Sequence, residues 1–305
     1  AARLAAAAKK PRPFYGLRWD EAEPVRAPDC SIAKGPVYTV QAVNSRLTVL
    51  DERGRIVLDD GAGNNFRRFS ELFASLAGTE DVEWYGPRCL FDEEVQRYFI
   101  VACGADFAGR DEGWLAVAVS AGANPLEGAW TVYGYRTDLT GTSAAVRWPE
   151  SLGAGTGGDF LVASWNDYAF GTDSFEGCRL GVFNKSGLVD GSDPHLAEVN
   201  DLRVSGGTPA FGVVPCRHHG ANSAFYLVSS EPGGGASLEL WRLTGTPRAP
   251  ELASVSVPGV LNYQAPPNGR QPGVPVGWAA DALELGDCRV RSAVADNDRI
   301  WTALN

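Results

Sequence analysis

The chain has 305 residues, of which 44% are hydrophobic and 21% charged, and its formal net charge is −10. This composition is typical of a globular protein and excludes global disorder. The negative charge argues against nucleic acid or an anionic membrane as a partner, because both require a basic surface, and no apolar run is long enough for membrane insertion.

The first part of the chain, residues 1–28, is interpreted as an N-terminal extension. Its opening "AARLAAAAKKPRP" is not a signal peptide, because the apolar stretch is short and the charges follow it. Met is absent, even at position 1. We therefore expect a processed, secreted, extracellular protein whose leader has been removed.

Residues 29–305 contain a repeated strand pattern. Similar apolar strands carry an aromatic residue at Tyr38, Phe99, Phe160, Tyr226 and Trp301, that is, at intervals of 61, 61, 66 and 75 residues. Helical periodicity is nearly absent, except at 66–78, where a short helix fits. Regular recurrence of this kind indicates a repeat architecture.

Further strands flank each of these anchors. Preceding strands are expected at 88–92, 147–153, 208–214 and 288–294, and following strands at 47–51, 115–120, 179–184 and 238–243. Fourth strands are expected at 54–58 and 128–136. Four antiparallel strands per unit predict an all-β fold, a β-propeller, with a β-sandwich as the main alternative.

The units predict four full blades and a half-blade at the C-terminus. An open half-blade exposes an apolar strand edge, which native proteins cover. The missing strands of this half-blade could come from the N-terminal extension, from a second protein chain, or from further blades of a longer protein.

Two segments resemble a family of secreted, multi-bladed propeller-like proteins. They are "GPVYTVQAVNSRLTVLDERG" and "GPRCLFDEEVQRYFIVA", and the likeness extends from about Ala27 to Leu304. The resemblance implies an extracellular protein without an assigned reaction, usually continued by further blades. The chain departs from the family pattern at Gly86, where the family has Asp.

The sequence favours a structural or binding module of an extracellular assembly, in contact with protein chains or glycans, and leaves enzymatic activity open. The alternative is a five-bladed glycoside hydrolase or lyase. In that case the carboxylates of the first strands, Asp92, Glu150 and Asp287, would meet at the central funnel. Their competing interpretation is structural: Asp92 caps a turn, and Asp287 pairs with Arg289.

Sugar binding without turnover is a third hypothesis, because aromatic faces stack on pyranose rings. The candidates in or beside predicted loops are Trp84, Trp114, Trp148, Trp165 and Trp278. Core packing is the alternative role for these side chains. The run "GAGTGG" at Gly153 lacks the Lys-Ser/Thr of a phosphate loop and is assigned to a hairpin turn.

Metal ligands are sparse in this sequence. His218 and His219 are adjacent, so on a strand they point to opposite faces, and no metal site is predicted there. Asp-rich loops such as 165–177 offer the oxygen ligands that calcium prefers, although turn chemistry explains them equally well.

Six cysteines, without a CxxC pair, favour disulfides in an oxidising compartment, and buried free thiols are the alternative. They are Cys30, Cys89, Cys103, Cys178, Cys216 and Cys288. A Cys89–Cys103 bridge across a hairpin is the pairing that we expect. Asn184, in "NKS", is the one N-glycosylation sequon.

Overall fold

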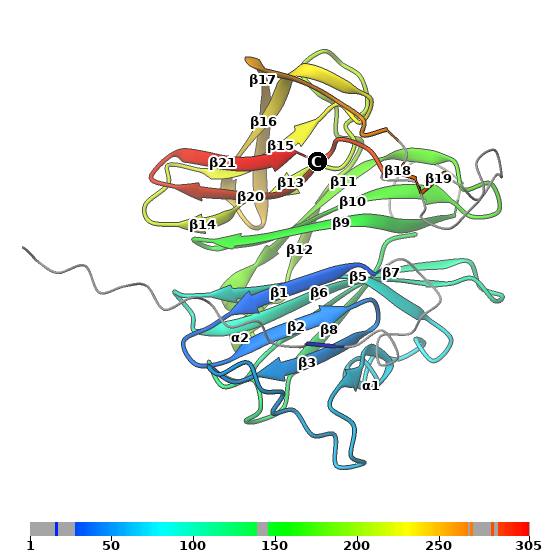
Figure 1. Cartoon of the computed structure of the whole chain (residues 1–305), viewed down its shortest axis with the longest axis vertical. Coiled ribbons are helices and arrows are strands. Elements are labelled where there is room, and N and C mark those ends of the chain that lie inside the picture. Colours follow the sequence, from blue (N-terminus) through cyan, green and yellow to red (C-terminus); the bar gives the residue numbers. More distant parts are fainter. Residues whose placement is uncertain are drawn as a thin grey trace, which may run out of the picture.

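The computed structural model describes residues 16–17, 28–138, 146–267, 269–270, 282–283 and 286–304. It shows an all-β chain whose five small sheets are arranged as a five-bladed β-propeller (Figure 1). The predicted fold class is therefore confirmed. The predicted number of blades, four and a half, is inexact.

The first two blades are built from consecutive antiparallel strands. Blade 1 has the order β1-β2-β3-β4, with strands at Cys30–Lys34, Thr39–Val43, Arg46–Leu50 and Arg67–Arg68. Blade 2 has the order β5-β6-β7-β8, with strands at Glu83–Asp92, Arg97–Asp106, Glu112–Val119 and Thr131–Arg136. Helix α1 (Phe69–Leu72) follows β4 and buries Phe69 completely, so the helix expected at 66–78 is present but short.

Blades 3 and 4 repeat this plan. Blade 3 pairs β9, β10, β11 and β12 in that order, at Arg147–Gly157, Phe160–Ala169, Phe175–Asn184 and Leu196–Val199. Blade 4 pairs β13, β15, β16 and β17, at Val214–Pro215, Phe225–Ser230, Gly234–Thr246 and Ala249–Gln264. Helix α2 (Lys185–Asp190) connects β11 to β12.

Blade 5 has three strands in the order β14-β20-β21, at Arg217–His219, Val290–Asp296 and Arg299–Leu304. The two C-terminal strands were expected to form half a blade. Their sheet gains β14, which pairs in parallel with β20. Because β14 follows β13 after a single residue, one inner segment serves blade 4 and then blade 5. A separate two-stranded sheet joins β18 (Gly269–Arg270) and β19 (Ala282–Leu283).

Two other expected strands differ from the structure. The segment 54–58 makes only an isolated bridge, between Ile56 and Leu50, and the fourth strand of blade 1 is β4. The first strand of blade 4 begins at Val214 instead of Thr208.

Little of the N-terminal extension belongs to the described residues. At its described part, the amide of Leu17 donates a hydrogen bond of 3.0 Å to Oε1 of Gln41 on β2. Whether the rest of 1–28 completes a blade lies outside the described residues. Among the helices of the described chain, none has the length and apolar character needed to cross a membrane.

Buried apolar side chains fill the space between successive blades. One cluster joins blades 1 and 2 through Val40 and Ile100, and the next joins blades 2 and 3 through Phe99 and Leu161. Two more lie between blades 3 and 4 and between blades 4 and 5. Because strand residues alternate between two faces, Phe99 and Ile100 serve different clusters. This alternation explains why β6 is buried along nearly its whole length.

A row of glycines lets β9 of blade 3 approach the inner segment 213–218, which serves blades 4 and 5. Gly153, Gly155 and Gly157 alternate along β9, so they share one face of that strand. A Cβ atom on Gly155 would collide with the carbonyl oxygen of Cys216, and one on Gly157 with His218. We call these three residues the glycine seam. The run expected in a hairpin turn therefore lies mostly within a strand.

Candidate functional site: a central pocket

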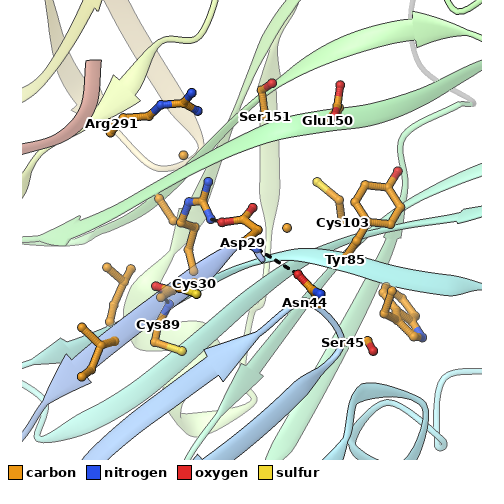
Figure 2. A pocket seen from close by; sticks show the side chains of 18 of the residues that line it. Asp29, Cys30, Asn44, Ser45, Tyr85, Cys89, Cys103, Glu150, Ser151 and Arg291 are labelled. Carbon is orange, nitrogen blue, oxygen red and sulfur yellow. Dashed lines mark hydrogen bonds and ion pairs between the residues drawn. The ribbon is translucent and has the colours of Figure 1, made fainter. Parts of the chain in front are cut away.

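The inner strands of all five blades line one central pocket with a volume of about 1340 Å³ (Figure 2). Blade 1 contributes Asp29 and Cys30, blade 2 contributes Tyr85 and Arg88, and blade 3 contributes Glu150. The pocket residues from the segment 214–217 and from β20 belong to blades 4 and 5. The site takes residues from every blade, so it forms only when the blades are arranged around it. This explains why no local sequence motif predicts it.

Asp29 is held firmly on its own blade. Its amide donates to Oδ1 of Asn44 at 2.9 Å, and the amide of Asn44 donates back to the Asp29 carbonyl at 2.9 Å. Its Oδ1 accepts a hydrogen bond of 2.9 Å from Nη1 of Arg88, an ion pair that links blades 1 and 2. The carboxylate is therefore fixed at the wall of the pocket, as Figure 2 shows.

Arg88 reaches this position because β5 is irregular. The register between β5 and β6 shifts between Tyr85 and Arg88, and Gly86 between them has a φ of 62°. Such a bulge re-aims the following side chain, and glycine accepts the left-handed conformation at no steric cost. Gly86 thus helps to shape the pocket wall.

Glu150 and Ser151 face the pocket from β9. A second register shift, between Ser164 and Asn166, lies opposite them, and Ser151 has a φ of 57°. Ser151 Oγ accepts a hydrogen bond of 2.5 Å from Nη1 of Arg289. Glu150 is exposed to the pocket, so it is a second carboxylate that a ligand there can reach.

The predicted trio of Asp92, Glu150 and Asp287 is not brought together. Asp92 is not among the residues lining the pocket; it is the last residue of β5 and is 4% exposed. Its Oδ1 accepts the amides of Glu94 and Val95 at 2.9 and 3.1 Å, and its Oδ2 accepts from Thr156 and Lys185. Asp92 is thus a turn cap and half of an ion pair, as the structural interpretation expected.

Asp287 likewise has a structural partner. Its carboxylate contacts Nε of Arg289 at 2.7 Å and Nη2 at 2.7 Å, and it accepts the amide of Arg289 at 3.0 Å. This is the pairing that the competing interpretation expected. Of the three predicted carboxylates, Glu150 alone lines the pocket.

Most of the predicted sugar-stacking tryptophans are core residues. Trp84, Trp114 and Trp165 are 5%, 9% and 1% exposed and belong to the clusters between blades. Trp148 is half-buried and stacks on Tyr168, with ring centroids 5.2 Å apart. Trp278 lies outside the described residues. Core packing, the alternative role, therefore accounts for Trp114 and Trp165, whereas Trp84 also lines the central pocket.

The expected Cys89–Cys103 disulfide is wrong. The register of β5 and β6 places Cys89 opposite Ile100 and Cys103 opposite Tyr85. The two side chains also lie on opposite faces of blade 2, because Cys89 belongs to the cluster with blade 1 and Cys103 to the cluster with blade 3. All six cysteines are free thiols.

The sequon and the histidines have structural contacts as well. Asn184 precedes α2, and its Nδ2 donates to the carbonyl of Asp193 at 3.2 Å. His218 accepts the amide of Tyr226 through Nε2 at 3.0 Å, and burial lowers the pKa of His218 to about 4. Within the described ranges, no group of three or more His, Cys, Asp or Glu side chains is placed to hold a metal ion. Calcium binding and glycosylation stay predictions.

Sequence reasoning missed Asp29 and four of the five arginines that line the pocket. The five are Arg68, Arg88, Arg217, Arg289 and Arg291. Asp29 directly precedes β1, and Arg217 directly follows Cys216, in a stretch where no strand was expected. Arginines on the expected first strands, such as Arg88 and Arg289, were the signal available in a chain that is acidic overall.

No family model and no curated protein matches this chain. Among solved structures, it is similar to a GH43 endo-arabinanase from Bacillus licheniformis, with 13% identity, 70% of this chain and 69% of the other covered, and a TM-score of 0.38. It is also similar to an exo-1,5-α-L-arabinanase from a bovine ruminal metagenomic library, with 9% identity, 91% and 96% covered, and a TM-score of 0.43. An α-L-arabinofuranosidase from Lactobacillus brevis gives 11% identity, 75% and 72% covered, and a TM-score of 0.36.

Proposed function

We propose that the central pocket processes a glycoside, with Asp29 and Glu150 as its pair of carboxylates. One observation carries this proposal: carboxylates from different blades line the same pocket, Asp29 before β1 and Glu150 on β9, with Glu83 of β5 as a third. Glycoside cleavage needs such a pair on either side of the glycosidic bond, one as acid and one as base or nucleophile. Asp29 thus takes the place of Asp92 and Asp287 as a candidate, while Glu150 is retained.

The two carboxylates differ in their surroundings, which suggests different roles. Asp29 accepts a hydrogen bond from Arg88 and is held at the pocket wall, and such a fixed position suits a base or nucleophile. Glu150 is exposed at the pocket, where the leaving oxygen of a bound glycoside can reach it, and we assign it the role of proton donor. The volume of about 1340 Å³ exceeds the roughly 300–1,000 Å³ of pockets for drug-sized ligands, so an oligosaccharide fits.

The test incubates the protein with a panel of oligosaccharides and measures the rate at which reducing ends are released. Glu150→Gln and Asp29→Asn should each lower the rate by roughly 10²–10⁴-fold, the typical contribution of a positioned acid or base. Glu127→Gln is the matched control, because Glu127 is exposed and does not line the pocket. Equal rates for Glu150→Gln and the unchanged protein would overturn the proposal.

A second candidate function is glycan binding without turnover. The Arg88–Asp29 ion pair favours it, because a carboxylate held by an arginine is less available to a reacting sugar. Tight binding of an oligosaccharide, with no release of reducing ends from any of the panel, would select this candidate. Secretion and an additional protein chain as partner stay proposals; co-purification of the native protein from the culture medium would test both.

A further inference from the structure

We infer that Arg217 and Arg291 bind an oxyanion of the ligand, so that the pocket takes an acidic glycan, one that bears carboxylate or sulfate groups. This inference rests on the proposed function for the place of the ligand and goes beyond it in naming the class of ligand. It starts from the ion pairs of the five arginines that line the central pocket.

Three of the five arginines have acidic partners. Arg68 pairs with Glu71 at 3.0 Å, Arg88 with Asp29 at 2.9 Å, and Arg289 with Asp287 at 2.7 Å. Within the part of the chain that the structure describes, Arg217 and Arg291 form neither an ion pair nor a side-chain hydrogen bond. The two unpaired arginines thus come from β14 and β20, the neighbouring strands of blade 5.

Arg217 lies in a poor environment for a cation. Its side chain is half-buried, and desolvation lowers the pKa of its guanidinium group. Among the described residues, the ionisable group that acts on it is the Cys89 thiol, and burial raises the pKa of Cys89 to about 12. Cys89 is therefore neutral near pH 7 and leaves the charge of Arg217 uncompensated.

Arg291 lines the pocket (Figure 2), and other cations lie near it. Desolvation is the largest cause that lowers the pKa of its guanidinium group, and the nearby charges of Arg289 and Arg88 lower that pKa further. The acids close to it, Asp287 and Asp29, are already paired with Arg289 and Arg88. The negative charges near Arg291 are therefore already engaged by Arg289 and Arg88.

The half-buried guanidinium group of Arg217 destabilises the empty protein, because a partly buried charge without a partner is costly; Arg291 is exposed and adds a second positive charge to the same pocket. An oxyanion between or beside them offsets that cost. The planar guanidinium group donates two parallel hydrogen bonds to a carboxylate or a sulfate, which makes arginine well suited to such ligands. The contrast with the overall charge of −10 supports a dedicated site, since the arginines do not belong to a generally basic surface.

The experiment measures binding of trigalacturonate to the full chain by calorimetry, beside its fully methyl-esterified form. The two trisaccharides share their ring chemistry and differ in charge. We expect the charged form to bind at least about tenfold more tightly, as a charge-assisted bond to arginine requires. The preference should shrink as the salt concentration rises from about 0.05 M to about 0.5 M, because salt screens charges.

Variants of the chain locate the effect. Arg217→Gln and Arg291→Gln should each remove most of the preference for the charged trisaccharide. Arg53→Gln is the matched control: Arg53 is exposed and is not among the residues lining the pocket. Folding is followed by thermal unfolding, and the empty Arg217→Gln protein should be at least as stable as the unchanged protein, because it loses an unpaired charge. A purely structural Arg217 would instead make this variant less stable.

The possible results of these measurements either uphold or overturn the acidic-glycan inference. Equal binding of the two trisaccharides, or a preference that survives both substitutions, overturns the inference. A titration with inorganic sulfate separates the sources of the oxyanion: if sulfate binds through both arginines and trigalacturonate does not bind, the site takes a free anion, and the acidic glycan is excluded. If the protein binds the charged trisaccharide preferentially but cleaves no glycoside, the inference is upheld and the proposed hydrolysis is contradicted. If it cleaves neutral glycosides and shows no preference for charge, the proposed hydrolysis is upheld and the inference is overturned.

Discussion

Nζ of Lys185 lies 3.0 Å from Oδ2 of Asp92, and this ion pair ties the helix α2 of blade 3 to the turn after β5 in blade 2. Lys185 and Asp92 are only 3% and 4% exposed. Thr156 also donates to the same carboxylate oxygen, and Glu94 at the surface contacts Lys185 at 2.7 Å. The pair therefore bridges two blades at a point where little water screens it.

Asp92→Ala should lower the free energy of unfolding by about 3–5 kcal/mol, because it leaves the buried ammonium group of Lys185 without its buried partner, with only the exposed Glu94 beside it. The double variant Asp92→Asn with Lys185→Met should regain a large part of that loss, since neither charge then remains. Chemical denaturation measures both. The surface pair Arg203–Asp201, with side chains 51% and 60% exposed, is the control: Asp201→Asn, which suits the left-handed backbone at this position, should cost below about 1 kcal/mol. A loss for Asp92→Ala no larger than this would contradict the bridging role.

The same residue predicts a pH dependence. Burial raises the pKa of Asp92, but the hydrogen bond from Thr156 and the charge of Lys185 outweigh burial, so the net pKa is below its ordinary value. A depressed carboxyl pKa contributes stability above the unfolded-state value of about 3.9, and this contribution is lost as pH falls through the folded-state pKa. Unfolding measured from pH 7 down to about pH 2 should therefore show a steeper acid loss in the unchanged protein than in Asp92→Asn. Parallel curves would contradict the assignment.

Cys30 should be the thiol that reacts in the native protein. It is exposed, whereas the other five cysteines are buried. Desolvation and the neighbouring Asp29 raise the pKa of Cys30, so its alkylation should be slower than that of free cysteine. Mass spectrometry after N-ethylmaleimide treatment should find one adduct, absent in Cys30→Ser and retained in the control Cys178→Ser. Unfolding without reductant should expose all six thiols; fewer would show that a disulfide is present after all.

The glycine seam gives a further prediction. Gly155→Ala should destabilise the protein by about 1–3 kcal/mol, because the added methyl group meets the backbone of Cys216, which has no flexible end to move aside. Gly109→Ala is the matched control, since nothing lies near its Cβ position, and its effect should stay within about 1 kcal/mol. Thermal unfolding compares the two. If Gly155→Ala unfolds at the same temperature as the unchanged protein, β9 and the backbone at Cys216 are less closely packed than the structure indicates.

The second and third strands of the blades could be predicted from sequence because they are buried on both faces. Phe99 in β6 and Phe160 in β10 stand out in such apolar runs. The outer strands β12 and β17 were missed, and β17 shows why: most of its residues are exposed, so it lacks a hydrophobic pattern. The parallel pairing of β14 with β20 joins positions far apart in the chain, as Arg217 and Val294 show, and no local signal predicts it.

The pocket was harder to predict than the strands. Acidic residues on first strands were good candidates in principle, and Glu150 does line the pocket. Asp92 was misplaced because a strand of 10 residues has one end near the pocket and another far from it, and the sequence does not say which end is which. Asp29 and Arg217 were missed because each lies next to a cysteine in a segment without strand periodicity.

The inner segment 214–219 is hydrogen-bonded to two sheets in turn, antiparallel to β15 and then parallel to β20. Backbone ladders of blades 4 and 5 therefore share one piece of chain, whereas blades 1, 2 and 3 are separate sheets. Breaking either ladder frees the other, so the last two blades form one cooperative unit of unfolding. Native-state hydrogen exchange should protect amides of β15 and β20 with the same free energy of opening, and an anion bound at Arg217 would slow exchange in both blades together.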